Sequence, residues 1–209
     1  MATIFRSVKA HMTPFPKIEA LILDWSGTLI DAHVIAPAVA FVQVFKDFGL
    51  EISMPEARKP MGLRKDLHIA KILEDPKVAQ RWTETHPNIP INQKLVDDMF
   101  DVFVPTQLDL LPQYCKPIPG IPEVVNKLQN LGYKLGATTG FTREMVEIIK
   151  DETKHHFKLD CDVAGDDILH GVRPYPHMVY ENMRLLGVHH PSHVIKIDDT
   201  LTGVGEGLN

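Results

Sequence analysis

A long stretch with only helical spacing, set between two segments in which short apolar runs alternate with helices, constrains the fold more than any other feature. The first run, residues 18–23, ends in Asp24 and turn residues, which is typical of a buried parallel strand. Three later runs have the same character: residues 133–138, 161–164 and 194–197. The sequence therefore predicts an α/β protein, with a Rossmann-like parallel sheet core and an inserted all-helical cap domain.

The change of pattern also places the domain boundaries. We assign residues 18–32 and 113–209 to the core and residues 33–112 to the cap, with hinges near 31–36 and 112–117. Within the cap, apolar residues recur at helical spacing in four segments: 37–48, 55–73, 76–83 and 92–110.

Charge and hydropathy exclude several classes of protein. The formal net charge is −5, and Lys and Arg never occur in runs longer than two, so we expect no nucleic-acid partner. No apolar run is long enough for a membrane span.

Cys115 and Cys161 cannot form a disulfide framework, and the N-terminus has no apolar segment of the kind found in secretory signals. We therefore expect a cytoplasmic protein with reduced thiols. We expect residues 1–17 to be a disordered leader, with a transit peptide as the less favoured alternative.

Polar residues follow three of the four predicted strands, at the sheet edge where ligands bind in folds of this kind. They are Asp24, Thr138-Thr139 and Asp198-Asp199. An aspartate at a strand end can act as a nucleophile or a metal ligand, whereas an isolated one would more often close a turn. Two carboxylate positions on one edge suit Mg²⁺, which prefers oxygen ligands. Arg173, in a predicted loop, could bind a phosphoryl group through two parallel hydrogen bonds, although alone it would be a surface cation.

The ordered set of these residues resembles the four motifs of the haloacid dehalogenase superfamily of phosphoryl-transfer enzymes. The motifs are Asp24-Trp25-Ser26-Gly27-Thr28, Thr138, Arg173 and Asp198-Asp199, and their order and strand placement match over residues 18–200. Each motif alone is a weak signal, and the ordered set is a strong one. The resemblance implies that Asp24 is the nucleophile.

One departure within the first motif narrows the reaction. The superfamily's phosphatases carry a second aspartate two residues after the nucleophile, which protonates the departing alkoxide, and this chain has Ser26 there. A serine hydroxyl is far too weak an acid for that task. The chain is therefore either inactive, or its leaving group needs no proton from this position. A phosphatase or mutase stays open as the alternative.

Residues 57–68 and three other segments are similar to the phosphonoacetaldehyde hydrolase family of this superfamily. The resemblance implies hydrolysis of the P–C bond of phosphonoacetaldehyde to acetaldehyde and phosphate, through a Schiff base on Lys65 and an aspartyl-phosphate. It places Met61 and His68 near the imine, and it implies a homodimer formed through the cap. The apolar residues of 37–48 could supply that interface or could form the core of the cap.

The same resemblance implies a set of binding residues. The expected substrate-binding residues are Thr138, Thr139, Gly140 and Arg173. The expected Mg²⁺ ligands are Asp24, the Ser26 backbone carbonyl and Asp199, with Asp198 as a further candidate. Two departures bear on the site: Phe141 stands where family members commonly have tyrosine, and residues 199–203 lack the later aspartate that some members have in the fourth motif.

The chain ends at Asn209, soon after the fourth motif, where the resembling proteins continue into another helix and a further core strand. We therefore expect the C-terminal part of the core to be missing and the fourth strand to be an exposed sheet edge. Such a truncated product would be poorly soluble, or a partner would cover that edge.

Overall fold

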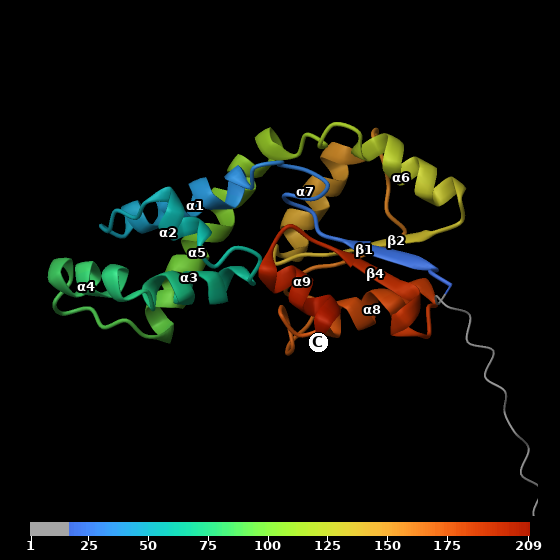
Figure 1. Cartoon of the computed structure of the whole chain (residues 1–209). Helices are drawn as coiled ribbons and strands as arrows, with labels where there is room; N and C mark the ends of the chain where they lie inside the picture. The colour runs from blue at the N-terminus through green and yellow to red at the C-terminus, as the bar shows by residue number, and fades with distance from the viewer. Residues whose placement is uncertain (1–16) are drawn as a thin grey trace, which may run out of the picture.

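The computed structural model describes residues 17–209, so the predicted leader, apart from Lys17, lies outside the described residues. At the centre is a parallel four-stranded sheet in the order β3-β2-β1-β4 (Figure 1). Its strands are β1 Ala20–Leu23, β2 Lys134–Thr138, β3 Cys161–Val163 and β4 Val194–Ile197. The predicted Rossmann-like α/β core is confirmed.

The register of the sheet brings the ends of three strands to one level. Leu23 pairs with Ala137 of β2 and with Ile197 of β4. Because these strands are parallel, their carboxyl ends share one edge of the sheet, which is where such folds bind ligands. The residues that follow the three paired positions are Asp24, Thr138 and Asp198.

Helices cover both faces of the sheet (Figure 1). On one face lie α6 Ile121–Asn130 and α7 Arg143–Thr153, and on the other α8 His177–Leu186 and α9 Leu201–Leu208. The side chains of β1 alternate between these faces, as they must in a strand. Leu21 and Leu23 belong to the larger apolar core, whereas Ile22 packs in a smaller cluster with Val179 of α8.

Five helices between β1 and α6 form the cap, on the left in Figure 1. They are α1 Ile35–Asp47, α2 Met54–Arg58, α3 Lys65–Leu73, α4 Pro76–Thr85 and α5 Gln93–Leu110, and a 3₁₀ turn, Leu111–Tyr114, follows α5. Aromatic packing joins α1 to α5, since the ring centroids of Phe41 and Phe103 lie 4.4 Å apart. Most of the apolar residues of α1, including Phe41 and Phe45, are buried within the chain. They form part of the core of the cap.

The two connections between cap and core run side by side. Ile30, in the first connection, forms an antiparallel bridge with Pro117 in the second. Asp31 and Val34 both adopt left-handed backbone conformations, with φ of 46° and 50°. That conformation is strained for a β-branched residue such as Val34. Both residues lie in the segment predicted as the first hinge.

The prediction of one helical segment over residues 55–73 is wrong, because the segment forms α2 and α3 with a loop between them. Pro60 has no N–H to donate within a helix, and Gly62 adopts a φ of 94°, which an α-helix cannot contain. The break directs the loop onto the core. There, the Met61 carbonyl accepts a hydrogen bond from the Thr202 hydroxyl of α9 (3.1 Å).

The sequence pattern does not predict α9. Three of its residues are glycine, which has low helix propensity: positions 203, 205 and 207. Thr200 starts the helix as its N-cap and accepts the Gly203 N–H (3.1 Å). The glycines also let the helix approach its neighbours, because a Cβ at Gly205 would lie 2.9 Å from Pro174 Cβ and one at Gly207 2.8 Å from Lys196 Cβ.

Exposed apolar side chains gather around β4 and α9. β4 is the last strand on its side of the sheet formed by the described residues, and Ile195 and Ile197 are partly exposed there. Leu201 and Leu208 of α9 are 94% and 82% exposed. The expected exposed sheet edge is therefore present.

Within residues 17–209, no helix combines the length and the apolar character that crossing a bilayer would need.

Candidate active site

Asp24 lies at the carboxyl end of β1, where its backbone N–H donates to the Ile197 carbonyl (3.0 Å). Its side chain is buried, and Oδ1 accepts a hydrogen bond from Arg173 Nη2 (2.8 Å). Burial raises the pKa of Asp24 to about 6, although the Arg173 guanidinium acts against this rise. The carboxylate is mostly ionised at neutral pH and is held in one orientation, as a nucleophile requires.

Arg173 is buried at the centre of the strand-end cluster and makes polar contacts with five other residues, one of them the Gly62 carbonyl of the cap loop (3.5 Å from Nη1). Its Nη2 donates to Asp24 and to the carbonyl and hydroxyl of Thr138 (2.8 and 3.0 Å), and it lies 3.0 Å from Asp198 Oδ2. Its Nε donates to Glu206 Oε2 (3.0 Å). Burial acts to lower the pKa of Arg173, but the three carboxylates raise it above its ordinary value. The guanidinium therefore stays charged and fixed beside the Asp24 carboxylate.

The strand-end cluster carries more negative than positive charge. Its four carboxylates belong to Asp24, Asp198, Asp199 and Glu206, and its two cations are Arg173 and Lys196. Two negative charges are therefore left without a partner in this cluster. A divalent cation would neutralise them, so the charge of the donor set fits Mg²⁺.

Three aspartates could contribute metal ligands. Asp24, Asp198 and Asp199 have carboxylate oxygens that all lie within 4.8 Å of one another. Asp198 is already engaged, because its oxygens accept from Lys196 Nζ (2.7 Å) and from the Thr200 N–H (2.9 Å). Asp24 and Asp199 are then the better carboxylate ligands. Together with a backbone carbonyl such as that of Ser26, they form the all-oxygen set that Mg²⁺ prefers.

Asp199 is packed closely against the loop that follows Asp24. A Cβ at Gly27 would lie 2.3 Å from Asp199 Oδ2, and the φ of Gly27 is 98°. Only glycine fits there, because it lacks the Cβ and tolerates the left-handed backbone. The glycine of the first motif therefore makes room for the Asp199 carboxylate.

Ser26 occupies the position at which phosphatases of the superfamily carry an acid. Its hydroxyl donates to Asp31 Oδ2 (3.3 Å), so it is directed toward the hinge. Asp31 in turn accepts the N–H groups of Ile35 and Ala36 (2.9 Å each) at the start of α1. Ser26 thus links the loop after Asp24 to the first cap helix.

The residues predicted to bind substrate after β2 take different positions. Thr139 and Gly140 line the same cavity as Asp24, whereas Thr138 does not. The Thr138 hydroxyl donates to Glu206 Oε2 (2.6 Å) and accepts from Arg173. In this arrangement it fixes the guanidinium and does not face the cavity.

Lys65 brings the cap into the site from the first turn of α3. Its side chain is buried, and its Nζ lies 4.5 Å from the centre of the Phe141 ring. Burial lowers the pKa of Lys65 to about 7, although the negative charge of Asp24 acts against this. A helix N-terminus also disfavours an ammonium group. A large fraction of Lys65 is therefore the free amine, which is the nucleophilic form, at neutral pH.

Met61 and His68, both predicted near the imine, differ in their placement. Met61 lines the cavity, whereas His68 is fully buried behind it and stacks on Phe41, with ring centroids 3.9 Å apart. His68 Nε2 lies 2.8 Å from the Ala57 carbonyl and must carry the proton, and Nδ1 has no partner. Burial and the nearby Lys65 lower the pKa of His68 to about 3, so the ring is neutral.

The cavity between cap and core is small. Asp24, Lys65, Phe141 and Arg173 are among the residues around it, and its volume is about 20 Å³. That is room for about one water molecule. A substrate of several heavy atoms can therefore enter only after the cap has moved away from the core.

Two charged residues that contact Arg173 and Asp198 escaped the sequence analysis. Glu206 of α9 is 1% exposed, and only one of its oxygens has hydrogen-bond partners. Lys196 of β4 has a side chain that is 4% exposed and pairs with Asp198. The sequence does mark both residues as charges within otherwise uncharged segments. Lys196 interrupts an apolar strand, and Glu206 is the one charged residue of its helix.

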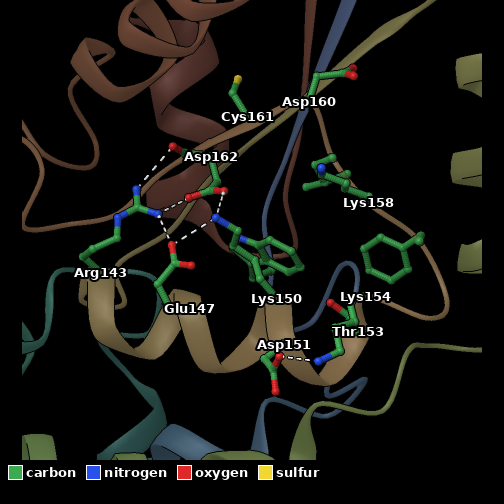
Figure 2. Close-up of a pocket in the computed structure, with 13 residues that line it drawn as sticks. Arg143, Glu147, Lys150, Asp151, Thr153, Lys154, Lys158, Asp160, Cys161 and Asp162 are labelled. Atoms are coloured by element: carbon green, nitrogen blue, oxygen red, sulfur yellow. Dashed lines mark hydrogen bonds and ion pairs between the residues drawn. The ribbon is translucent and has the colours of Figure 1, made fainter.

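A second cavity, of about 620 Å³, lies between α7 and β3, away from these residues (Figure 2). Arg143 and Lys150 are paired there with Glu147 and Asp162, as the dashed lines in Figure 2 show. These charges neutralise one another. The larger cavity therefore lacks the uncompensated negative charge of the strand-end cluster.

The fold and the strand-end residues define a class of hydrolase. Residues 18–208 match the family model described as haloacid dehalogenase-like hydrolase, and the chain belongs to that family. Within it, the chain belongs with the phosphonoacetaldehyde hydrolases. It is 41% identical over 194 residues to phosphonoacetaldehyde hydrolase from Bacillus cereus (strain B4264), a match that covers 92% of this chain and 73% of the relative.

Solved structures agree with this assignment. The chain superposes with a TM-score of 0.89 and 36% identity on a phosphonoacetaldehyde hydrolase-like protein from Oleispira antarctica, covering 92% of this chain and 70% of that one. A β-phosphoglucomutase from Clostridium difficile has a TM-score of 0.73 at 16% identity, covering 91% and 80% of the two chains. The second likeness shows a shared fold only.

Proposed function

We propose that this protein hydrolyses the P–C bond of phosphonoacetaldehyde to acetaldehyde and phosphate. One observation carries the proposal: a buried lysine amine and a buried aspartate carboxylate line the same small cavity, one from the cap and one from the core. An amine suits an aldehyde, and a carboxylate beside a guanidinium suits a phosphonyl group. The B. cereus and O. antarctica relatives support this choice of substrate.

Lys65 acts first, by condensing with the aldehyde carbon. The pKa of about 7 supplies the free amine, and loss of water then gives a protonated imine. The imine matters because a P–C bond breaks only if the carbon can accept the electron pair. The imine nitrogen takes up that pair, and the carbon leaves phosphorus as an enamine.

Asp24 then attacks phosphorus and forms an aspartyl-phosphate. Attack of a carboxylate on an anionic phosphonyl group needs compensating charge, and Arg173, bonded to Asp24 Oδ1, supplies part of it. A Mg²⁺ ion held by Asp24, the Ser26 carbonyl and Asp199 would add further positive charge. Because no alkoxide departs, Ser26 needs no acidic proton.

Two hydrolyses complete the cycle. The enamine takes a proton on carbon, and water releases acetaldehyde from Lys65. Water also cleaves the aspartyl-phosphate and frees Asp24. His68 supports these steps by position: its bond to the Ala57 carbonyl joins α3 to α2 and thereby orients Lys65.

The product assay tests this reaction directly. Purified protein with Mg²⁺ and phosphonoacetaldehyde should release acetaldehyde and phosphate in equal amounts, with Asp24→Asn as the inactive control. Acetaldehyde is measured by coupled reduction with an alcohol dehydrogenase, and phosphate by a colorimetric assay. Comparable turnover of p-nitrophenyl phosphate without acetaldehyde release would instead favour a phosphatase.

A further inference from the structure

Among the described residues, two hydrogen bonds join the cap loop of residues 59–64 to the core. The Met61 carbonyl accepts the Thr202 hydroxyl (3.1 Å), and the Gly62 carbonyl accepts Arg173 Nη1 (3.5 Å). The second distance is at the outer limit for a hydrogen bond, so the Thr202 hydroxyl makes the better bond. Thr202 belongs to the first turn of α9 and is not one of the residues around the cavity.

The backbone of the cap loop lies directly on two threonine hydroxyls. A Cβ at Gly62 would lie 2.2 Å from Thr202 Oγ1 and 2.4 Å from Thr200 Oγ1. Arg64, two residues after Gly62, is the N-cap of α3, and Lys65 is the first residue of that helix. A contact that fixes the loop on the core therefore also fixes the start of the helix that carries the amine.

We infer that the Thr202 hydroxyl is a latch that holds the cap loop on the core, and that Thr202 is a positioning residue for Lys65. The hydroxyl has one proton, and with the cap docked on the core that proton goes to the Met61 carbonyl. The bond is lost when the cap moves away. Because the bond exists only with the cap docked, it shifts the balance between docked and open protein toward the docked form.

The size of this shift is limited, because the Thr202 hydroxyl finds other partners when the cap opens. Thr200 Oγ1 lies 3.4 Å away, and water is the other partner. Exchange of one hydrogen bond for another leaves a net effect of about 3- to 10-fold on an equilibrium. Loss of the hydroxyl should raise the open fraction by that factor. The role of the latch in turnover rests on the proposed function, in which Lys65 must reach a substrate held at Asp24.

Labelling with trinitrobenzenesulfonate tests the inference without substrate. With the cap docked, Lys65 is 4% exposed beside a cavity of about 20 Å³, which is far too small for this reagent. Only the open protein is therefore labelled at Lys65. Peptide mapping by mass spectrometry gives the labelling rate of Lys65 relative to that of Lys71, an exposed lysine of the same helix.

Three variants separate the hydroxyl from the rest of the side chain. Thr202→Val keeps the shape of the side chain and removes the hydroxyl, whereas Thr202→Ser keeps the hydroxyl. Thr106→Val is the matched control, because the Thr106 hydroxyl donates to the Val102 carbonyl within its own cap helix and does not contact the core. The melting temperature of each variant shows whether faster labelling comes from unfolding.

Lys65 should be labelled about 3 to 10 times faster in Thr202→Val than in the native protein, and within about twofold of the native rate in Thr202→Ser and Thr106→Val. The melting temperature should change by no more than about 4 °C in all three variants.

Three results would overturn the latch. They are equal labelling of Lys65 in Thr202→Val and the native protein, labelling in Thr202→Ser as fast as in Thr202→Val, and native Lys65 labelled as fast as Lys71. If the native protein releases no acetaldehyde from phosphonoacetaldehyde, the proposed function fails, and the labelling rates still decide the latch.

Discussion

The Nζ atom of Lys65 in the cap lies 4.5 Å from the centre of the Phe141 ring in the core. The two residues line the same small cavity, one from the cap and one from the core, and both are buried. An ammonium would gain from the face of an aromatic ring, but burial outweighs this gain and lowers the pKa of Lys65. The apolar ring therefore helps keep water from the amine that the proposed reaction uses.

Substitution Phe141→Ala should separate the contribution of this ring to stability from its effect on the pKa of Lys65. Removing a buried ring should lower the free energy of unfolding by about 3–5 kcal/mol. It should also admit water and move the pKa of Lys65 back toward its ordinary value. Phe157→Ala is the control, because Phe157 is a buried core residue that does not line the cavity beside Lys65. Chemical denaturation should show a lower free energy of unfolding for both variants. A pKa of Lys65 that rises equally in both variants would contradict the role of the Phe141 ring.

The reaction of Lys65 with an aldehyde should depend on pH with a midpoint of about 7. Below the midpoint the group is an ammonium and cannot condense, so the rate should fall about tenfold per pH unit. Above it the amine is free, and the rate should be flat. The rate of reductive modification by acetaldehyde and cyanoborohydride measures this profile. A rate that keeps rising toward pH 10 would mean that the amine is not desolvated.

Substitution Glu206→Gln should weaken the site without unfolding the protein. The amide oxygen can still accept from Thr138 and Arg173, but the charge that helps fix the guanidinium is lost. We expect a loss of about 1–3 kcal/mol in the free energy of unfolding, and a fall of about tenfold in kcat/KM. Glu144→Gln, on the exposed face of α7, is the matched control and should change stability by no more than about 0.5 kcal/mol. Equal behaviour of the two variants would contradict the role of Glu206.

Substitution Gly140→Ala should hinder closure of the cap. A Cβ at Gly140 would lie 2.3 Å from the carbonyl oxygen of Leu63 in the cap loop, and its backbone is not left-handed. The folded core should therefore keep its stability while kcat/KM falls by about 100-fold. Gly165→Ala is the milder control, because its nearest atoms are 3.2 Å away and include the flexible Arg64 side chain. Full activity in Gly140→Ala would show that the cap need not close this tightly.

Local sequence signals were enough to place the sheet and to put Asp24 at the end of β1. The apolar run before Asp24 predicts a buried strand, and parallel pairing then determines which residues meet at its end. The break at Pro60 and Gly62 was harder to predict, because apolar spacing continues on both sides of it. Helix α9 forms although three of its residues are glycine, which has low helix propensity. Close packing explains these glycines, and only the tertiary structure reveals that packing.

Residues that act through buried ion pairs were the least predictable. Asp198 carries the same sequence signal as Asp199, yet one binds two cations and the other covers Gly27. Glu206 is distant in sequence from Arg173, so nothing local relates them. His68 was predicted beside the imine from the family resemblance of residues 57–68, and its helical spacing puts it on the same face as Lys65. In the structure it lies one layer behind the cavity, against Phe41.

Borohydride trapping tests the central claim most directly, since it detects the covalent bond between substrate and enzyme. Protein incubated with phosphonoacetaldehyde and then reduced should carry one stable adduct, which peptide mapping by mass spectrometry assigns to Lys65. Lys65→Arg should carry none, and Lys71→Arg, an exposed lysine of the same helix, should be labelled like the native protein. Absence of an adduct in folded, Mg²⁺-loaded native protein that releases phosphate, or an adduct that persists in Lys65→Arg, would contradict the account.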